Sequence, residues 1–115
     1  MEIKAEKYSV TYDSTTAMVT CEGSLLLNGS EEYEPILQLL KIAAEQQEHL
    51  ILDLRTLKFL NSSGINMMTK FVVYVSDIER LDVNLTMVGR KNVAWQEKLS
   101  KNLKRLMPTL QARLE

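Results

Sequence analysis

The chain has 115 residues, of which 45% are hydrophobic and 25% are charged, and its formal net charge is −1. These values are typical of a globular protein, and we expect one domain spanning residues 1–115. The balanced charge gives no overall attraction to nucleic acid. The N-terminus has no secretory pattern, and no apolar run approaches the roughly 18 residues of a membrane-spanning helix. We therefore expect a cytoplasmic protein with neither direct nucleic-acid binding nor membrane insertion.

The first part of the chain predicts a β-hairpin followed by a helix. Tyr8, Val10 and Tyr12 recur at a period of two, which is typical of a half-buried strand. Turn-forming residues at 13–16 lead into a second β-type segment at 17–27, where Gly23 indicates a bulge. Residues 30–47 then show helical spacing, with glutamates in the opening turns. The predicted buried stripe of this helix is Ile36, Leu37, Leu40, Ala43 and Ala44.

The rest of the chain predicts two further strand–helix units. The run HLILDL at 49–54 is continuously apolar, so we expect a central strand buried on both faces. A helix over 65–81, a strand over 83–89 and an amphipathic helix over 94–107 follow. The predicted core residues of the two helices are Ile65, Met68, Phe71, Val72, Val75 and Ile78, and Trp95, Leu99, Leu103 and Leu106. The order β-β-α-β-α-β-α predicts an α/β fold, with helices packed against a mixed sheet of four to five strands.

Few residues are available for catalysis. His49 is the only histidine and Cys21 the only cysteine, so a histidine-based metal centre or a Cys–His pair has little to draw on. We expect His49 at the surface and Cys21 as a small apolar core residue. No phosphate-binding glycine motif occurs, and Asp53 has no obvious partner carboxylate for acid–base chemistry. The sequence therefore predicts a protein that is not an enzyme and has no metal and no cofactor.

The C-terminal part of the chain is basic. Residues 89–115 contain seven Lys or Arg but only two Glu. We interpret this excess as the solvated face of the last helix. Contact between that helix and an acidic protein partner stays open.

Residues 61–64, NSSG, lie between the central strand and the helix that follows it. Open α/β sheets place functional residues at this edge. Asn61 or Ser62 suits the N-cap of the helix, and Gly64 would let the backbone turn. Ser62 and Ser63 would lie among free backbone amides at the positive end of the helix dipole, where a phosphate is tolerated. The loop is therefore either a helix cap alone or a phosphorylated loop that controls docking.

The segment LILDLRTLKFLNSSGINMM at 50–68 resembles the signature of the STAS domain, the fold of bacterial anti-sigma factor antagonists. In that family a strand containing L-D-L precedes D-S-S/T-G-L at the start of a helix, and the order of the other elements also agrees. The resemblance implies partner switching. The antagonist binds an anti-sigma factor that is also a serine kinase of the histidine-kinase-like ATPase fold, and a metal-dependent serine phosphatase reverses the phosphorylation. By position the phosphoacceptor is Ser62, with Ser63 as second choice, and the implied partner-binding residues are Asn61, Ser62, Ser63, Gly64 and Ile65.

Two positions depart from the family signature. Asn61 stands where the family usually has Asp, and Ile65 stands in place of Leu. Asn keeps the capping geometry but lacks the negative charge that would face a kinase. The resemblance is nearest to stand-alone regulatory STAS proteins of bacteria, cyanobacteria included. Two alternatives stay open, namely a constitutive STAS subunit of a transport or sensory assembly without a working phosphosite, and a nucleotide-binding domain. Self-association as a weak homodimer is also left open.

Overall fold

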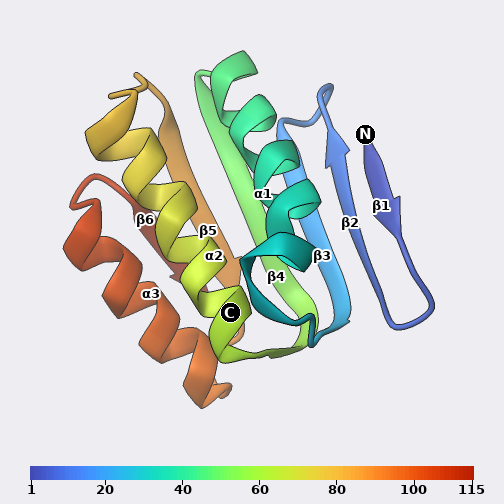
Figure 1. Ribbon diagram of the computed structural model, residues 1–115. Coiled ribbons are helices and arrows are strands. Elements are labelled where there is room, and N and C mark those ends of the chain that lie inside the picture. Colours follow the sequence, from blue (N-terminus) through green and yellow to red (C-terminus); the bar gives the residue numbers. More distant parts are fainter.

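The computed structural model describes residues 1–115 and contains one six-stranded sheet whose strands lie side by side in chain order (Figure 1). The strands are β1 (Glu2–Lys4), β2 (Tyr8–Asp13), β3 (Met18–Leu25), β4 (His49–Leu60), β5 (Asn84–Gly89) and β6 (Gln111–Leu114). The helices are α1 (Gly29–Gln46), α2 (Ser62–Val73), which continues as the π-helical turn η1 (Tyr74–Ile78), and α3 (Ala94–Leu106). Strands β1 to β3 pair antiparallel, and β3 to β6 pair parallel. The predicted α/β class and mixed sheet are confirmed.

The sheet has six strands where the sequence predicted four to five. The two additional strands, β1 and β6, form the two edges of the sheet. They have three and four residues, which is too short for a period of two to be recognised. Pairing with a neighbouring strand, rather than local pattern, makes these segments extended.

All three helices cover the same face of the sheet (Figure 1). Each right-handed crossover between successive parallel strands places its helix on the same side when the strands follow in chain order. The core lies between the helices and the sheet, and it includes the register partners Val19, Leu52 and Met87. The predicted central position of this strand is confirmed, but its predicted burial on both faces is only partly correct. Ile51 and Asp53 point to the face without helices, where Asp53 is buried and Ile51 is partly exposed.

Strand β4 is longer than predicted because it is bulged. Its register against β3 shifts between Thr20 and Glu22 and again between Gly23 and Ser24, and β4 has the extra residue each time. The buried positions of its second half, Leu54, Leu57 and Leu60, are consequently three residues apart. This spacing does not match a regular strand, so the sequence pattern indicated an end at residue 54. Gly23 does lie at an irregularity, but the inserted residue belongs to β4.

Most predicted core residues are buried. The whole predicted stripe of α1 is buried, as are Met68, Phe71, Val72, Val75, Leu99 and Leu103. Two predictions are wrong, since Ile78 is 66% exposed and Leu106 is also exposed. The π-helical geometry of η1 changes the residues per turn and rotates Ile78 away from the core. Leu106 is the last residue of α3, and the following Met107 is buried instead.

The single cysteine and the single histidine lie where the sequence predicted. Cys21 is fully buried, and this burial, together with the negative charge of Asp53, raises the pKa of its thiol to about 12. The thiol is therefore protonated and unreactive in the folded protein. His49 is exposed at the start of β4, where its ring contacts Asn84. None of the helices combines the length and the apolar character needed to cross a bilayer.

Candidate functional site: the N-terminus of helix α2

Three loops meet at the edge of the sheet where the parallel strands end. They are residues 26–28 after β3, Asn61 after β4, and residues 90–93 after β5. The first turns of α1 and α2 lie next to each other here, because the amide of Gly29 donates a hydrogen bond to the Ser63 hydroxyl at 3.3 Å (Figure 1). The predicted site residues 61–65 are therefore part of a larger surface formed by three connections.

Asn61 is the N-cap of α2 and also holds the neighbouring loop. Its Oδ1 accepts a hydrogen bond from the Gly64 amide at 3.0 Å, which confirms the predicted cap. Its Nδ2 donates to the Leu27 carbonyl at 2.7 Å, across to the loop between β3 and α1. An aspartate has no donor for this second bond and would place a charged oxygen against that carbonyl. The departure from the family's Asp therefore has a structural reason in this chain.

Tyr33 completes this junction, and the sequence reasoning missed it. Its side chain is buried, and its hydroxyl lies 2.7 Å from Asn61 Oδ1 and 2.9 Å from the Leu25 carbonyl. The single hydroxyl proton can serve one of these acceptors at a time. Burial raises the pKa of Tyr33, so the hydroxyl stays a donor. The sequence does contain a sign of this role, because Tyr33 lies one turn before Ile36 and Leu37 on the predicted buried stripe. A tyrosine buried at such a position needs a polar partner for its hydroxyl.

Gly64 is required for close packing. Its backbone is not in the left-handed region, so the predicted role as a turn residue is wrong. A Cβ at this position would lie 2.7 Å from the Tyr33 hydroxyl and would also collide with the side chain of Leu60. The glycine thus allows α2 to start directly against α1 and the end of β4.

The two serines of the motif have different surroundings. Ser62 is exposed at the first position of α2, and its hydroxyl makes no hydrogen bond within the protein. Ser63 is only partly exposed, accepts the bond from Gly29, and lines a groove of about 180 Å³ between α1 and α2. Ile65 is partly buried against the core. Of the two hydroxyl groups, that of Ser62 is the more accessible from outside the protein.

Exposed apolar side chains flank the serine loop. Leu26, in the loop after β3, is 55% exposed, and Phe59, three residues before Ser62, is 59% exposed. Leu26 directly follows β3, and Phe59 lies near the end of β4, the strand that pairs with β3. The two apolar side chains therefore extend from neighbouring strand ends. Lys58 and Arg90 are also exposed at this edge. The edge therefore offers apolar and basic contacts beside the Ser62 hydroxyl.

Helix α3 replaces a missing strand beside the second half of β4. Pairing between β4 and β5 ends at Asp53 and Val88. Beyond this point the buried Gln96 donates from Nε2 to the carbonyls of Leu54 at 2.8 Å and Leu57 at 3.2 Å. These bonds satisfy main-chain acceptors that the sheet leaves without a partner.

Two further side chains support the same stretch of β4. Trp95 donates from Nε1 to the Lys58 carbonyl at 3.2 Å, and Arg90 donates from Nε to the Arg55 carbonyl at 3.3 Å. Gln96 also accepts from the Arg90 amide at 2.7 Å, so all three residues act together. The sequence reasoning treated Trp95 as core and missed Gln96, which lies three residues before Leu99 on the buried face of α3.

Asp53 has a basic partner that the sequence did not indicate. Arg55 donates to the Asp53 carboxylate from its amide, from Nε and from Nη2, each at 3.0 Å, and contacts Glu115 at 3.2 Å through Nη1. Burial by itself would raise the pKa of Asp53, but the hydrogen bonds and charge of Arg55 outweigh it, so the pKa lies below its usual value. The carboxylate is a structural acceptor in a bulged strand.

This ion pair predicts a specific loss of stability in acid. Because the folded-state pKa of Asp53 is lowered, its contribution is fully present above the unfolded pKa of about 3.9 and is lost as pH falls through the folded value. We expect Asp53→Asn to lower the free energy of unfolding by about 1 kcal/mol at pH 7, a small value because Arg55 is partly exposed to solvent. Urea titrations at pH 7 and pH 3 should show the difference from the unmodified protein shrinking at the lower pH. A constant difference would contradict the assigned ion pair.

Comparison with known proteins places this arrangement in a STAS-like fold. No protein-family model and no curated protein matches the sequence. A structure of diguanylate cyclase SiaD in complex with its activator SiaC from Pseudomonas aeruginosa superposes with a TM-score of 0.72 and 14% identity, covering 100% of this chain and 99% of the other. SiaC alone gives 0.69 at 15% identity, covering 100% and 96%. An anti-sigma factor antagonist from Mycobacterium paratuberculosis gives 0.55 at 16% identity, covering 96% and 82%. The resemblance to the STAS fold is thus confirmed, and at these identities the similarity concerns the fold alone.

Proposed function

We propose that this protein is a non-catalytic regulator that binds a partner enzyme through the edge of the sheet around Ser62, and that phosphorylation of Ser62 controls this binding. The observation that carries the proposal is the free, exposed Ser62 hydroxyl at the capped N-terminus of α2. The exposed Leu26 and Phe59 beside it supply apolar contact area of the kind that anchors protein interfaces.

The site suits a switch that does not disturb the fold. A phosphate on Ser62 would lie at the positive end of the α2 dipole, near free backbone amides, and would add about −1.5 to −2 charges. Asn61, Tyr33 and Gly64 hold the start of α2 through contacts that do not involve Ser62. The added charge therefore changes the docking surface while the cap stays intact.

Two classes of partner are consistent with this proposal. The sequence motif favours an anti-sigma factor that is also a serine kinase of the histidine-kinase-like ATPase fold, together with a metal-dependent phosphatase. The fold similarity to SiaC, described as the activator of a diguanylate cyclase, favours a cyclase as the regulated enzyme. In both cases residues 61–65 form the centre of the contact, and Ser63 is the second-choice acceptor.

The test compares baits in a pull-down from a lysate of the source organism, with the captured proteins identified by mass spectrometry. We expect Ser62→Ala to retain a kinase, phosphatase or cyclase that Ser62→Glu loses or exchanges. Both variants should keep the melting temperature of the unmodified protein, because the Ser62 side chain is exposed and makes no hydrogen bond. Purified candidates then allow phosphotransfer to Ser62, or a change in cyclase activity, to be measured directly.

Asn66→Asp is a matched control for Ser62→Glu. Asn66 is also exposed near the start of α2, one turn after Ser62, so this variant adds a negative charge without changing the hydroxyl. We expect Ser62→Glu to affect binding more strongly. If all baits retain the same partners, the protein is a constitutive subunit and NSSG is a helix cap. A large loss of stability in Ser62→Glu would contradict the free position of this serine.

A further inference from the structure

The face of the sheet opposite the helices has no covering element (Figure 1). Sheets of parallel strands are almost always covered on both faces, yet β3 to β6 are parallel here and covered on one. The uncovered side is a broad face formed by residues from all six strands. Most of this face lies away from the edge that carries Ser62, and only Phe59, in register with Ser24, is close to both. The inference below goes beyond the proposed function and does not depend on it.

Strand register defines two rows of side chains across this face. The register partners of the first row, from β2 to β6, are Asp13, Met18, Ile51, Thr86 and Gln111. The partners of the second row, from β1 to β6, are Glu2, Thr11, Thr20, Asp53, Val88 and Arg113. The two central strands, β3 and β4, thus carry an apolar pair, Met18 and Ile51, and both of these side chains are partly exposed.

Charge is distributed unevenly over the same face. On the side of β1 to β3, acidic residues prevail, with Glu2, Asp13 and Glu22 against Lys4. On the side of β4 to β6, Arg55 pairs with Asp53 and Glu115. Arg113 also contacts Glu115, at 3.6 Å, but its side chain stays 64% exposed, and Arg90 follows β5. Glu2 and Arg113 are the two ends of one row, at opposite edges of the sheet.

We propose that this face binds a second copy of the chain, related by a two-fold axis that runs parallel to the strands and between β3 and β4. This rotation places β1 of one copy over β6 of the other and leaves the position along the strands unchanged. Glu2 of each copy then lies over Arg113 of the other copy, which gives two symmetric ion pairs. Met18 of each copy lies over Ile51 of the other, so the apolar centre is complementary to itself.

The charges of this row favour an axis parallel to the strands. A two-fold axis perpendicular to the strands at the level of this row would instead place Glu2 over Glu2 and Arg113 over Arg113, which is repulsive. Six strands about 4.8 Å apart and roughly 20 Å long give a face on the order of 600 Å², close to the roughly 800 Å² that each partner contributes to a standard interface. Two sheets stacked with nearly aligned strands are an established packing.

This dimer has a geometric consequence for the Ser62 edge. Because the axis is parallel to the strands, both copies present their strand ends in the same direction. Two Ser62 loops would therefore lie on one end of the assembly, an arrangement that fits a partner with two-fold symmetry. The loops themselves stay outside the interface between the copies.

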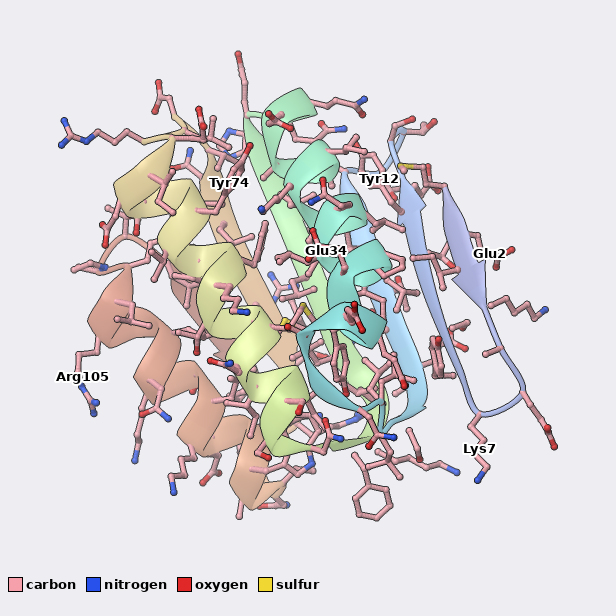
Figure 2. All side chains as sticks on the ribbon, in the orientation of Figure 1. Glu2, Lys7, Tyr12, Glu34, Tyr74 and Arg105 are labelled. Carbon is pink, nitrogen blue, oxygen red and sulfur yellow. The ribbon has the colours of Figure 1, made fainter.

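A charge-exchange experiment tests the interface, with the dimer dissociation constant measured by sedimentation equilibrium. Glu2 lies on the outer edge strand (Figure 2). Both Glu2 and Arg113 are exposed, and the contact of Arg113 with Glu115 is a surface ion pair worth at most about 1 kcal/mol, so neither substitution should prevent folding. Glu2→Arg and Arg113→Glu, made singly, should each weaken the dimer about tenfold, because each variant changes two attractions into repulsions. The double variant, carrying both exchanges, should restore the dimer to within about twofold of the unmodified protein.

Arg105→Glu is the matched control, because Arg105 is exposed on α3, on the side of the sheet with the helices (Figure 2). It changes the net charge as Arg113→Glu does but should leave the dissociation constant unchanged. Ile51→Lys would place two positive charges beside the axis and should abolish the dimer. A chain that sediments as a monomer at every concentration overturns the proposal. So does a dimer that the single exchanges leave intact or the double exchange fails to restore.

Discussion

Gln96→Glu is expected to destabilise the protein by about 3 kcal/mol at neutral pH, although it changes one amide group into a carboxylate of the same size. Gln96 is 1% exposed, and its Nε2 donates to the carbonyls of Leu54 and Leu57. A carboxylate has no donor, so both carbonyls lose their partner and face a buried negative charge. Because these carbonyls belong to the bulged half of β4, the loss affects the strand that leads into Asn61.

The pH dependence of this variant has a defined sign. Burial raises the folded-state pKa of the introduced glutamate above its unfolded value of about 4.3. The part of the loss caused by the buried charge is therefore fully present above the raised pKa and disappears as pH falls to the unfolded value. The protonated carboxyl group still has one donor for two carbonyls, so a smaller loss remains. Denaturant titrations at pH 7 and pH 5 should show the variant approaching the unmodified protein at the lower pH.

The same substitution at an exposed glutamine is the control for Gln96→Glu. Gln111 is exposed on β6, so Gln111→Glu should change the free energy of unfolding by less than about 0.5 kcal/mol at either pH. If Gln96→Glu were as stable as this control, α3 would not hold the end of β4. The inference that α3 helps to position the Ser62 loop would then also be wrong.

Asn61→Asp is expected to cost about 2 kcal/mol, although aspartate is an equally good N-cap residue and restores the family signature. The carboxylate can still accept from the Gly64 amide and from the Tyr33 hydroxyl. It cannot donate to the Leu27 carbonyl, and it places a negative oxygen where the amide now lies 2.7 Å from that carbonyl. The favourable charge at the helix N-terminus, about 0.5 kcal/mol, offsets only part of this loss.

The N-cap of α1 supplies the control for Asn61→Asp. Asn28 occupies that position without a side-chain capping bond, and it is exposed. Asn28→Asp should be neutral or slightly stabilising in the same thermal unfolding measurement. Equal effects of the two substitutions would mean that the amide of Asn61 has no special role, and that the departure from the family's Asp has no structural cause.

The motif itself could be predicted from the sequence, but its surroundings could not, because they depend on contacts between residues far apart in the chain. The residues NSSG could be recognised because a cap, two hydroxyls and a glycine follow an apolar strand. Tyr33, 28 positions before Asn61, and Gln96, whose acceptors are 42 and 39 positions earlier, leave no local pattern that points to these partners. The accessibility of Ser62 compared with Ser63 likewise depends on Gly29, which α1 brings next to α2.

The sequence by itself determined the hairpin, the alternation of strands and helices, the buried stripes and the position of the motif, because these follow from local periodicity and capping preferences. Tertiary structure alone decided the two short edge strands, the bulges of β4, the exposure of Ile78 and the packing role of Gly64. Each of these depends on a partner elsewhere in the chain, such as β2 for β1, β3 for the bulges, and Tyr33 for Gly64. The uncovered face of the sheet belongs to the same group, since it results from three successive crossovers of one hand.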